Sequence, residues 1–550
     1  MISGSIDSQE ANQPLAEASA GEPMTARNPF PVVGIGASAG GLEAFTQLLS
    51  HLPENTGMVF VLVQHLDPEH PSHLTHLLSR ATTMPVHKVE DGMMIEPDHV
   101  YVIPPNTNLN LSKGKLRLTP RESSGVPHPV DSFFCSLAKE QQSGAIGVVL
   151  SGTGSDGTLG LKEIKGAGGI TFAQDEKSAK FSGMPLQAAN DSVDFVLPPE
   201  KIALELARIG RDPNLALSPK TENEAAEAAG AKDFQRVLAL LRLHCGVDLS
   251  QYRDTTLKRR IQRRMVVRTC HALADYLKLL ETENGEIRAL FDDMLINVTS
   301  FFRDPEVFET LKAGIFPEIL KTRPQTIRVW VAACSTGQEV YSLAIALLEF
   351  LEQKPNAPGI QIFATDISES ISIEKGRRGF YPESIEAEVS PGRLRRFFTK
   401  EDGGYRISKT IRDLCIFAKQ NVTCDPPFSH LDLVSCRNLL IYLTPELQRH
   451  VISTFHYALN PRGYLLLGNS ETVGANSDLF ELLDRKHKIY LKKSRRHPAL
   501  PTFPSAGFEI PDGRRGTSYP LPSFHADGFS KRSRPHFAWP FRPGGCAGEQ

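Results

Sequence analysis

Cysteine is scarce in this sequence, and its few copies are scattered. The chain holds 8 cysteines in 550 residues, with no C-x-x-C pair and no histidine-rich cluster. This pattern argues against a zinc motif and against a disulfide framework, and it is typical of a reducing compartment. We therefore expect buried free thiols, no bound metal ion and a cytoplasmic location.

Long apolar runs and an excess of one charge are missing as well. No apolar run approaches the ~18 residues of a membrane-spanning helix, so no membrane insertion is expected. Residues 1–23 lack the basic and apolar regions of a signal peptide. The 61 Lys and Arg residues nearly balance the 63 Asp and Glu residues, for a net charge of −2. We therefore expect no general attraction to nucleic acid or to anionic membranes.

What the sequence does contain is a strand–helix rhythm that occurs twice. The chain is too long for one hydrophobic core, so several domains are expected. Apolar strands alternate with helical patterns from Pro31 to Ile209, and again from Ile327 to Lys493. In the first series this alternation predicts a doubly wound parallel sheet with helices on both faces. The two series share no motif, so the second is not a repeat of the first.

Composition sets the expected boundaries between these parts. Residues 211–230 lose the rhythm and are rich in Ala, Glu and Pro, which indicates a linker. The C-terminal stretch is rich in Pro, Gly, Ser and Arg without periodicity, which is typical of disorder. The expected segments are a disordered N-terminus at 1–28, an α/β domain at 29–212, a linker at 213–231, a helical domain at 232–291, a second α/β domain at 292–493 and a disordered tail at 494–550.

A glycine-rich turn follows the first strand of the first domain. Gly34, Gly36 and Ala39 match the G-x-G-x-x-G/A fingerprint of dinucleotide-binding folds, as in a NAD-dependent oxidoreductase. That interpretation needs an acid at the end of the second strand to hold the ribose, but Gln64 and His65 stand there. The missing acid disfavours a dinucleotide and leaves the turn available for chemistry.

Ser38 stands at the crest of this turn, and two further reactive side chains follow other strands. His65 comes after the second strand, and Asp156 follows the fourth strand in SGTGSDGTLG. Because the carboxyl ends of parallel strands gather at one edge, we expect the three side chains to converge. A serine, a histidine and an aspartate are the parts of a nucleophile–base–orienter triad. Ser38 would also lie at a helix N-terminus, where free N–H groups can stabilise an oxyanion.

The first domain resembles the CheB-type chemotaxis protein-glutamate methylesterases. The matching segments, in order, are GIGASAGG, VQHLDPEH, HPVDSFFCSLA, VVLSGTGSDG and AQDEKSAKFSGMP. The resemblance implies that Ser38 is the nucleophile, His65 the base and Asp156 the third member of a triad that hydrolyses glutamyl methyl esters. Ala39 stands where many relatives have Thr. Relatives usually carry a receiver domain before the esterase; only residues 1–28 precede it here, so no receiver control in cis is expected.

The second α/β domain contains a different turn, around Gly337. The segment IRVWVAACSTGQEVYSLAIAL gives an apolar strand, a turn with one glycine and a helix. Asp366 ends the next strand, which is where a ribose-binding acid belongs. The glycines that bring a pyrophosphate close to the backbone are absent. Their absence favours an adenosine ligand without phosphates, S-adenosylmethionine, over NAD.

Residues 232–493 resemble the CheR-type chemotaxis glutamate methyltransferases, through NVTSFFRD, AACSTGQEVYSLA, FATDIS, FAKQNV and LVSCRNLLIYL. The resemblance implies a helical domain followed by a Rossmann-like domain. It also implies a small inserted β subdomain, which RLRRFFTKEDGGYRISKTIRDLCIFAKQN fits. Arg303 and Tyr442 would flank the transferred methyl group and its acceptor, and Val340 replaces the family's usual Pro. The residues implied to line the S-adenosylmethionine site are Asn297, Thr299, Arg303, Glu339, Asp366, Asn421, Val422, Arg437 and Asn438.

A strongly basic stretch precedes this domain. Seven basic residues and one acid lie between Arg253 and Arg268, and the spacing of Lys258, Arg259 and Arg263 predicts a helix with a basic face. That face is either solvated or a docking surface for an acidic partner. Aromatic side chains that would stack on nucleic acid are lacking beside it. The resemblance implies contact with the acidic methylation helices of a receptor.

The two resemblances together predict a bifunctional enzyme that methylates receptor glutamates and hydrolyses the resulting esters. The expected partner is a methyl-accepting chemotaxis-type receptor, with a histidine kinase or a response regulator acting in trans. The alternative is a signalling scaffold whose catalytic modules only dock partners. Retention of Ser38, His65, Asp156, Arg303 and Asp366 argues against it, because a scaffold does not need them.

Overall fold

A computed structural model describes most of the chain between the two ends. The described residues are 30–64, 74–120, 128–191, 193–212, 224–295, 298–322, 325–352 and 354–494. The expected disordered ends at 1–28 and 494–550 lie outside them except for Ser494, and so do the predicted site residues His65 and Asn297. Within the described ranges, no helix combines the length and the apolar character needed to cross a membrane.

The first domain is built on a seven-stranded sheet in the order β10-β9-β8-β1-β2-β5-β3. Every neighbouring pair in it is parallel, which confirms the predicted doubly wound sheet. Its central strands are buried apolar runs, as parallel strands covered on both faces require. The strands are β1 Val32–Ala37, β2 Val59–Gln64, β3 Val86–Lys88, β5 Val100–Val102, β8 Ala145–Val149, β9 Ile170–Gln174 and β10 Phe195–Leu197.

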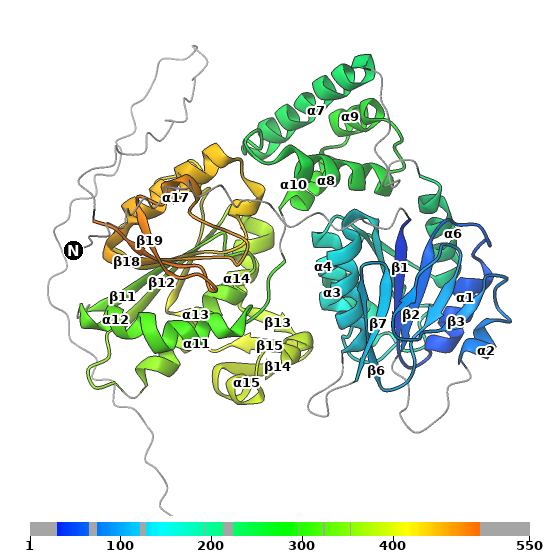
Figure 1. Cartoon of the computed structure of the whole chain (residues 1–550), viewed down its shortest axis with the longest axis horizontal. Coiled ribbons are helices and arrows are strands. Elements are labelled where there is room, and N and C mark those ends of the chain that lie inside the picture. Colours follow the sequence, from blue (N-terminus) through cyan, green and yellow to red (C-terminus); the bar gives the residue numbers. More distant parts are fainter. Residues whose placement is uncertain are drawn as a thin grey trace, which may run out of the picture. The chain divides into compact units, whose positions relative to one another are not determined.

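Helices cover both faces of this sheet (Figure 1). Phe45 of α1 and Leu206 of α6 belong to one hydrophobic cluster, whereas Phe134 of α3 and Leu161 of α4 belong to another. The helices are α1 Gly41–Ser50, α2 Leu74–Leu78, α3 Pro129–Gln141, α4 Thr158–Gly166, α5 Gly183–Asp191 and α6 Pro199–Gly210. A small antiparallel sheet, which we did not predict, joins β4 Met93–Met94, β6 Thr107–Ser112 and β7 Lys115–Pro120.

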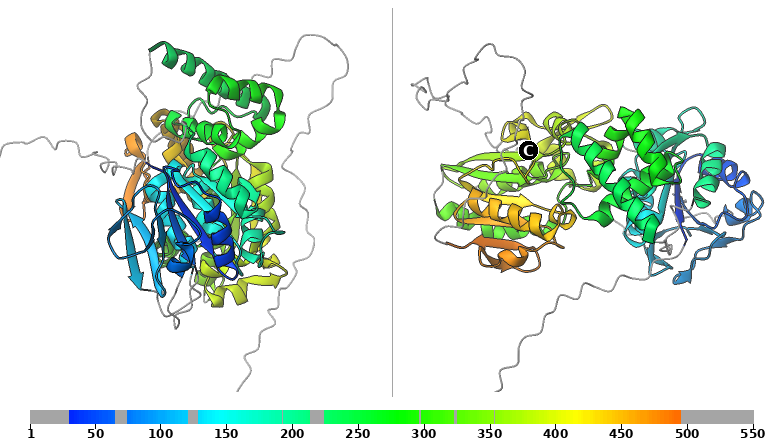
Figure 2. Two further views of the ribbon diagram at one scale, coloured as in Figure 1. Left: turned by 90° about the vertical axis from the view of Figure 1, so that its right-hand side faces the viewer. Right: turned by 90° about the horizontal axis from the view of Figure 1, so that it is seen from above.

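Four helices follow and form one group in every view (Figures 1 and 2). They are α7 Glu224–Cys245, α8 Asp254–Val267, α9 Leu273–Thr282 and α10 Asn284–Met294. Leu241, Leu257, Tyr276 and Leu290, one from each helix, share a hydrophobic core. The helical series was predicted to start at Lys232, after a linker; α7 instead begins at Glu224. Ala and Glu favour helix, so the composition taken for a linker supports this extension.

The last domain contains a second seven-stranded sheet, in the order β16-β12-β11-β17-β18-β20-β19. The pairs from β16 to β18 are parallel, and β20 runs antiparallel to both β18 and β19. The strand order reverses between β11 and β17, the place where open α/β sheets bind ligands. The strands are β11 Thr326–Ala332, β12 Gly359–Asp366, β16 Cys415–Lys419, β17 Leu431–Cys436, β18 Leu459–Leu467, β19 Phe480–Asp484 and β20 Ile489–Lys492.

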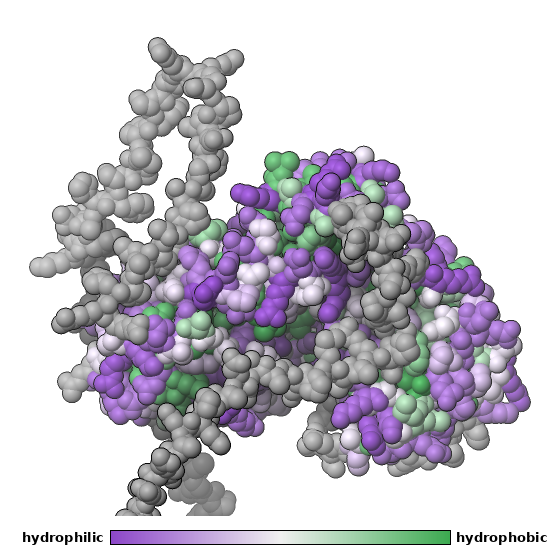
Figure 3. Space-filling view, turned by 45° about the horizontal axis from the view of Figure 1, so that its top comes forward, coloured by the Kyte–Doolittle hydropathy of each residue, from purple (hydrophilic) through white to green (hydrophobic). Residues whose placement is uncertain are grey.

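A small antiparallel sheet lies between β12 and β16 in the chain. It consists of β13 Phe380–Pro382, β14 Phe398–Glu401 and β15 Gly404–Ile407, and it confirms the predicted inserted β subdomain. The helices of this domain are α11 Pro305–Thr310, α12 Phe316–Lys321, α13 Gln338–Leu351, α14 Glu374–Arg378, α15 Pro391–Phe397, α16 Lys409–Arg412 and α17 Pro445–Ala458. Hydrophilic side chains cover most of the described surface that Figure 3 draws.

Candidate functional sites

Ser38 follows β1 in a tight turn that leads directly into α1. Its N–H donates to the carbonyl of Ser151 at 3.0 Å, and its own carbonyl accepts from Gly41 N–H at 2.9 Å. Gly40 has φ +76°, and a Cβ there would lie 2.6 Å from the Ser151 hydroxyl. The turn therefore needs glycine at this position, and it places Ser38 just before the N-terminus of α1.

Ser151 is a residue of this region that the sequence motifs did not single out. Its hydroxyl donates to the carbonyl of Ala39 at 2.9 Å and accepts from Phe181 N–H at 3.0 Å. Its own N–H donates to Gln174 Oε1 at 2.8 Å. Ser151 therefore joins the Ser38 turn to the end of β9 and to the segment that follows it.

Asp156 is buried beside the start of α3. Its two carboxylate oxygens accept the N–H groups of Val130 and Asp131 at 3.0 and 2.9 Å. His128 Nδ1 lies 3.8 Å from the same carboxylate. Burial and the Asp156 charge raise the pKa of Asp131 well above its usual value. These contacts fix the orientation of the Asp156 carboxylate.

The sheet order brings the ends of three relevant strands together. β8 and β2 flank β1 on its two sides, so Asp156 and Ser38 follow adjacent parallel strands. Gln64 is the last residue of β2, and its side-chain amide donates to the carbonyl of Ser38 at 3.4 Å. His65 is the next residue and lies outside the described ranges. Its place in a triad with Ser38 and Asp156 stays a prediction.

A cavity of about 640 Å³ lies at the carboxyl edge of the second sheet. Nine of the ten residues predicted to contact cofactor or acceptor line this cavity, and the tenth, Asn297, lies outside the described residues. The nine are Thr299, Arg303, Glu339, Asp366, Asn421, Val422, Arg437, Asn438 and Tyr442.

Asp366 ends β12 and is held by the backbone around it. Its Oδ2 accepts Ser335 N–H at 2.9 Å, and its Oδ1 accepts Ser368 N–H at 3.0 Å. Burial raises the pKa of Asp366, although these hydrogen bonds partly oppose the shift. Gly337, at φ +94°, turns the chain into α13. This turn has no glycine-rich cradle for phosphates, so the Asp366 carboxylate is the polar group that distinguishes it.

Glu339 of α13 and Arg437, which directly follows β17, contact each other across the point where the strand order reverses. Ser435 donates its hydroxyl to Glu339 Oε1 at 2.5 Å, and Arg437 lies 3.5 Å from Glu339 Oε2. Arg437 also pairs with Asp304, which follows the cavity residue Arg303 in the chain. Arg437 is therefore neutralised by two carboxylates and acts as a bridge between the strand end and the 298–304 loop.

Glu471 is a second residue that the motifs did not reveal. Its carboxylate accepts the N–H groups of Asn438 at 2.9 Å, Leu440 at 2.7 Å and Gly468 at 2.7 Å. Asn438 has φ +64°, a backbone conformation that needs such support. Burial raises the pKa of Glu471. Glu471 therefore organises the loop that carries Asn438 and Tyr442.

Arg303 and Tyr442 line the cavity together with Glu163 and Arg260, which belong to the two preceding domains. Arg303 donates to the carbonyl of Val298 at 3.2 Å. The carbonyl of Tyr442 accepts Arg253 N–H at 2.9 Å, which ties this loop to the start of α8. Burial raises the pKa of the Tyr442 phenol, and the charges of Arg260 and Arg303 partly oppose it.

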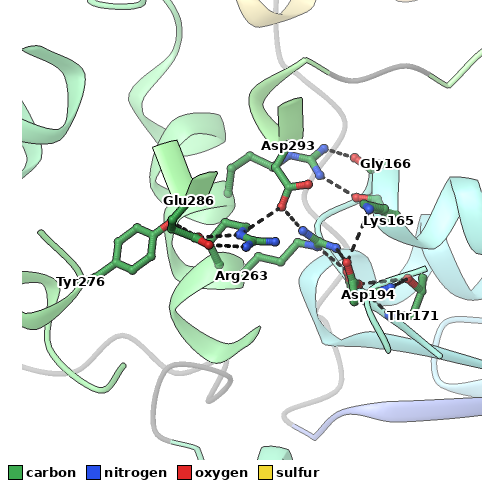
Figure 4. Close-up of polar contacts among 11 residues, drawn as sticks. Lys165, Gly166, Thr171, Asp194, Arg263, Tyr276, Glu286 and Asp293 are labelled. Carbon is green, nitrogen blue, oxygen red and sulfur yellow. Dashed lines mark hydrogen bonds and ion pairs between the residues drawn. The ribbon is translucent and has the colours of Figure 1, made fainter. Parts of the chain in front are cut away.

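The predicted basic helix forms as α8, but the expected exposed basic face is wrong for Arg263. Arg263 is 3% exposed, and it pairs with Asp194 of the first domain and with Asp293 of α10. Arg264 makes two hydrogen bonds to Glu286, at 2.9 and 2.6 Å. Figure 4 shows Arg263, Asp194, Asp293 and Glu286 in one connected cluster. Carboxylates of the same chain therefore pair with Arg263 and Arg264 of this helix.

Comparison with protein families divides the chain in the same way. Residues 33–206 match the CheB methylesterase model, 232–295 the CheR methyltransferase all-alpha domain, and 297–489 the CheR methyltransferase SAM binding domain. S-adenosylmethionine (SAM) is thus the co-substrate of the domain that contains the cavity. The geometry of the cavity agrees with a SAM site. The Asp366 carboxylate is held at the end of β12, and the turn before α13 has no glycine-rich cradle for phosphates.

Individual relatives cover different parts of the chain. The "Uncharacterized 104.1 kDa protein in hypE 3'region" of Rhodobacter capsulatus is 39% identical over 443 residues, which are 76% of this chain and 46% of that protein. This chain thus spans about half the length of that relative. "Chemotaxis protein methyltransferase 1" of Pseudomonas aeruginosa is 33% identical over 265 residues, 46% of this chain and 96% of that protein.

Among solved structures, the catalytic domain of the Thermotoga maritima CheB methylesterase is 31% identical and has a TM-score of 0.31. The match covers 33% of this chain and 98% of that one. The family models place both kinds of domain in this one chain, in sequence order. The chain therefore belongs to the chemotaxis methylation enzymes, with a CheB methylesterase domain followed by the all-alpha and SAM-binding domains of a CheR methyltransferase.

Proposed function

We propose that this chain both writes and erases glutamyl methyl esters on a chemotaxis-type receptor. One observation carries the proposal. Nine residues that we assign to the cofactor or to the acceptor line the same cavity of the methyltransferase domain. In the other domain, Ser38 and Asp156 follow adjacent strands, and His65 follows the strand on the other side of β1. Both sites thus retain the groups that the chemistry requires, which a passive scaffold does not need.

In the methyltransferase domain, we assign the reacting end of the cavity to Arg303 and Tyr442. SAM supplies an electrophilic methyl group on a sulfonium, and a receptor glutamate oxygen forms the new C–O bond as the S–CH3 bond breaks. Arg303 orients the acceptor carboxylate by hydrogen bonds, without a base, because the carboxylate is already ionised at neutral pH. Asp366 holds the adenosine end, and alignment of the reacting atoms supplies the rate enhancement.

In the methylesterase domain, Ser38 attacks the ester carbonyl while His65 takes the hydroxyl proton. Asp156 orients His65 and stabilises its charged form. The N–H groups at the start of α1 are the donors that we assign to the tetrahedral oxyanion. Methanol leaves with the proton from His65, and water then hydrolyses the acyl-Ser38 bond to restore the glutamate carboxylate. The N–H of Asp131 supports this arrangement by donating to the Asp156 carboxylate at 2.9 Å.

The proposed partner is the cytoplasmic part of a methyl-accepting receptor, with a histidine kinase or response regulator acting in trans. Scattered cysteines support a cytoplasmic location, because none of the described ones forms a disulfide. The acceptor must present a glutamate that reaches the end of the cavity near Arg303 and Tyr442.

Transfer of a labelled methyl group from SAM to a receptor fragment tests the proposal. We expect base-labile label on the fragment with the Ser38→Ala variant, and none with Asp366→Ala, which removes the acid at the end of β12. Pre-methylated fragment should release methanol with wild type and with Asp366→Ala, but not with Ser38→Ala. Absence of label with every variant would overturn the methyltransferase assignment; methanol release by Ser38→Ala would overturn the esterase assignment.

A further inference from the structure

One helix of the esterase domain reaches both candidate sites. Helix α4, Thr158–Gly166, begins directly after the Asp156 loop. Its other end forms part of the wall of the methyltransferase cavity, to which Glu163 and Gly166 contribute. Lys139 of α3 lines the same cavity. The acceptor end of the methyltransferase is therefore bounded by the esterase domain.

Glu163 is the acidic side chain that this helix contributes to the cavity. Burial raises the pKa of Glu163, while the charges of Arg303 and then Lys139 lower it, so the carboxylate lies in the field of the residue assigned to orient the acceptor. Its charge also acts on Tyr442. Among the described residues, no hydrogen bond or ion pair engages its side chain, and Glu163 is one of the residues that line the cavity.

Glu163 offers the same functional group as the acceptor. The proposed substrate is a glutamate carboxylate, which Arg303 would orient beside Tyr442. A glutamate carboxylate of the same chain already lines this cavity, lies in the field of Arg303, and acts with its own charge on Tyr442. A receptor glutamate and Glu163 therefore compete for the same electrostatic site.

Two buried arginines of α8 hold α4 in this place. Arg260 donates to the carbonyl of Lys165 at 2.5 Å and to that of Gly166, and so caps the last turn of α4. Arg263 donates to the carbonyl of Gly169 at 2.8 Å and pairs with Asp194. Figure 4 shows Lys165, Gly166 and Asp194 of the esterase domain in contact with side chains of the helical domain. The position of Glu163 is thus fixed by a specific, buried set of contacts.

We propose that Glu163 is an intramolecular competitor of the receptor glutamate at the acceptor end of the methyltransferase cavity, and that it acts through its charge. The proposal rests on the proposed function, because it assumes that a receptor glutamate enters at Arg303. Binding of the receptor glutamate beside Arg303 disfavours the Glu163 carboxylate there, and Glu163 disfavours the receptor glutamate to the same extent. The two opposed activities of the chain are thereby coupled through one helix.

The test compares KM values for a receptor fragment in full-length chains that all carry Ser38→Ala, so that esters accumulate. Glu163→Gln and Glu163→Ala remove the competing charge. Glu200→Gln is the matched control, because Glu200 is half-exposed in the same domain, at the start of α6, and does not line the cavity. We expect both Glu163 variants to lower KM by about threefold or more, with kcat unchanged, and Glu200→Gln to leave KM as it was.

An unchanged KM in both Glu163 variants, with receptor methylation intact, would overturn the competition while leaving the proposed function standing. Failure of every chain to methylate the receptor would overturn the proposed function, and the competition with it. The intact mass of the Ser38→Ala chain incubated with SAM alone should not increase. A methyl group found on Glu163 would make it an acceptor and would overturn its role as a competitor.

Discussion

At the scale of single residues, both candidate sites are organised by carboxylates that accept backbone N–H groups. Asp156 holds the start of α3, Asp366 holds the turn before α13, and Glu471 holds the loop that carries Asn438. A carboxylate in this position stabilises a loop conformation that the backbone alone would not keep. Asp156 and Asp366 are themselves assigned to chemistry or cofactor binding, and the loop that Glu471 holds carries Asn438 and Tyr442.

Replacement of Glu471 by glutamine tests whether such a carboxylate stabilises its loop. Glutamine keeps the shape of the side chain but has one oxygen acceptor instead of two. In Glu471→Gln the amide NH2 would face backbone donors, so we expect a loss of about 1–3 kcal/mol in unfolding free energy. We also expect weaker SAM binding, since the Asn438 loop lines the cavity. Urea unfolding and calorimetric titration measure the two effects. Exposed Glu481→Gln is the control, and equal behaviour of the two variants would contradict the account.

The sequence predicts some of these residues and not others, for a physical reason. Asp366 ends β12 and Asp156 lies in the loop after β8, and the alternation of apolar strands with helical patterns is enough to locate such positions. Glu471 and Ser151 act through backbone groups that lie far away in the chain, at Asn438 and at Ala39 and Phe181. A backbone partner leaves no mark in the sequence, so neither residue could be recognised from it.

At the scale of elements, the inserted β subdomain supports the loop that enters the cavity. Glu388, which follows β13 in the chain, accepts Phe301 N–H at 2.6 Å. The Phe301 ring packs edge-on against Tyr381 of β13 and Phe398 of β14, with centroids 4.8 and 5.5 Å apart. The insertion therefore positions the 298–304 loop, which includes the cavity residues Thr299 and Arg303.

The Glu388 contact predicts a pH dependence of stability. Burial raises the pKa of Glu388 from 4.5 to about 7, although the Phe301 hydrogen bond opposes the shift. The native state keeps a proton that the unfolded chain releases, so this contribution is present below pH 4.5 and is lost as pH rises through about 7. Relative to wild type, Glu388→Gln should therefore gain stability between pH 5 and pH 8, by no more than about 3 kcal/mol.

Urea midpoints at pH 5 and pH 8 measure this effect. Glu446→Gln, at an exposed position at the start of α17, is the control and should show no such gain. A difference between wild type and Glu388→Gln that stays the same at both pH values would contradict the assigned shift.

Elements with strong periodicity were predictable, and short or compositionally ambiguous ones were not. The apolar runs of β1, β8, β11 and β17 are buried strands, as predicted. The strands β4, β6 and β7 are short or partly exposed, so their pattern does not separate them from loop. The start of α7 was missed because Ala and Glu are common both in linkers and in helices.

At the scale of the whole molecule, the esterase and helical domains are joined by buried charge. Arg263 lies between Asp194 of the esterase domain and Asp293 of α10. Burial raises the pKa of Asp194, but the charges of Arg263 and Lys165 outweigh it and lower the pKa overall. The prediction of an exposed basic face failed here because the neutralising acid lies in another domain, where spacing along the helix cannot reveal it.

Removal of one partner should therefore destabilise the joined domains strongly. In Asp194→Asn, Arg263 keeps a buried charge with one carboxylate fewer, and we expect a loss of about 3–5 kcal/mol and a lower Tm by calorimetry. The matched control is Asp91→Asn, which breaks the exposed Arg117 pair and should cost at most about 1 kcal/mol. Equal Tm shifts for the two variants would show that the Arg263 cluster does not join the domains.

The central claim is that one chain carries two opposed and working activities, and the most direct measurement follows both products at once. Wild-type chain, SAM and a receptor fragment are incubated together, and S-adenosylhomocysteine and methanol are measured over time. The account predicts that both products accumulate continuously, with one methanol for each S-adenosylhomocysteine once the ester level is steady. Ser38→Ala should stop after one S-adenosylhomocysteine per acceptor glutamate and release no methanol. Methanol from Ser38→Ala, or S-adenosylhomocysteine without methanol from wild type, would contradict the claim.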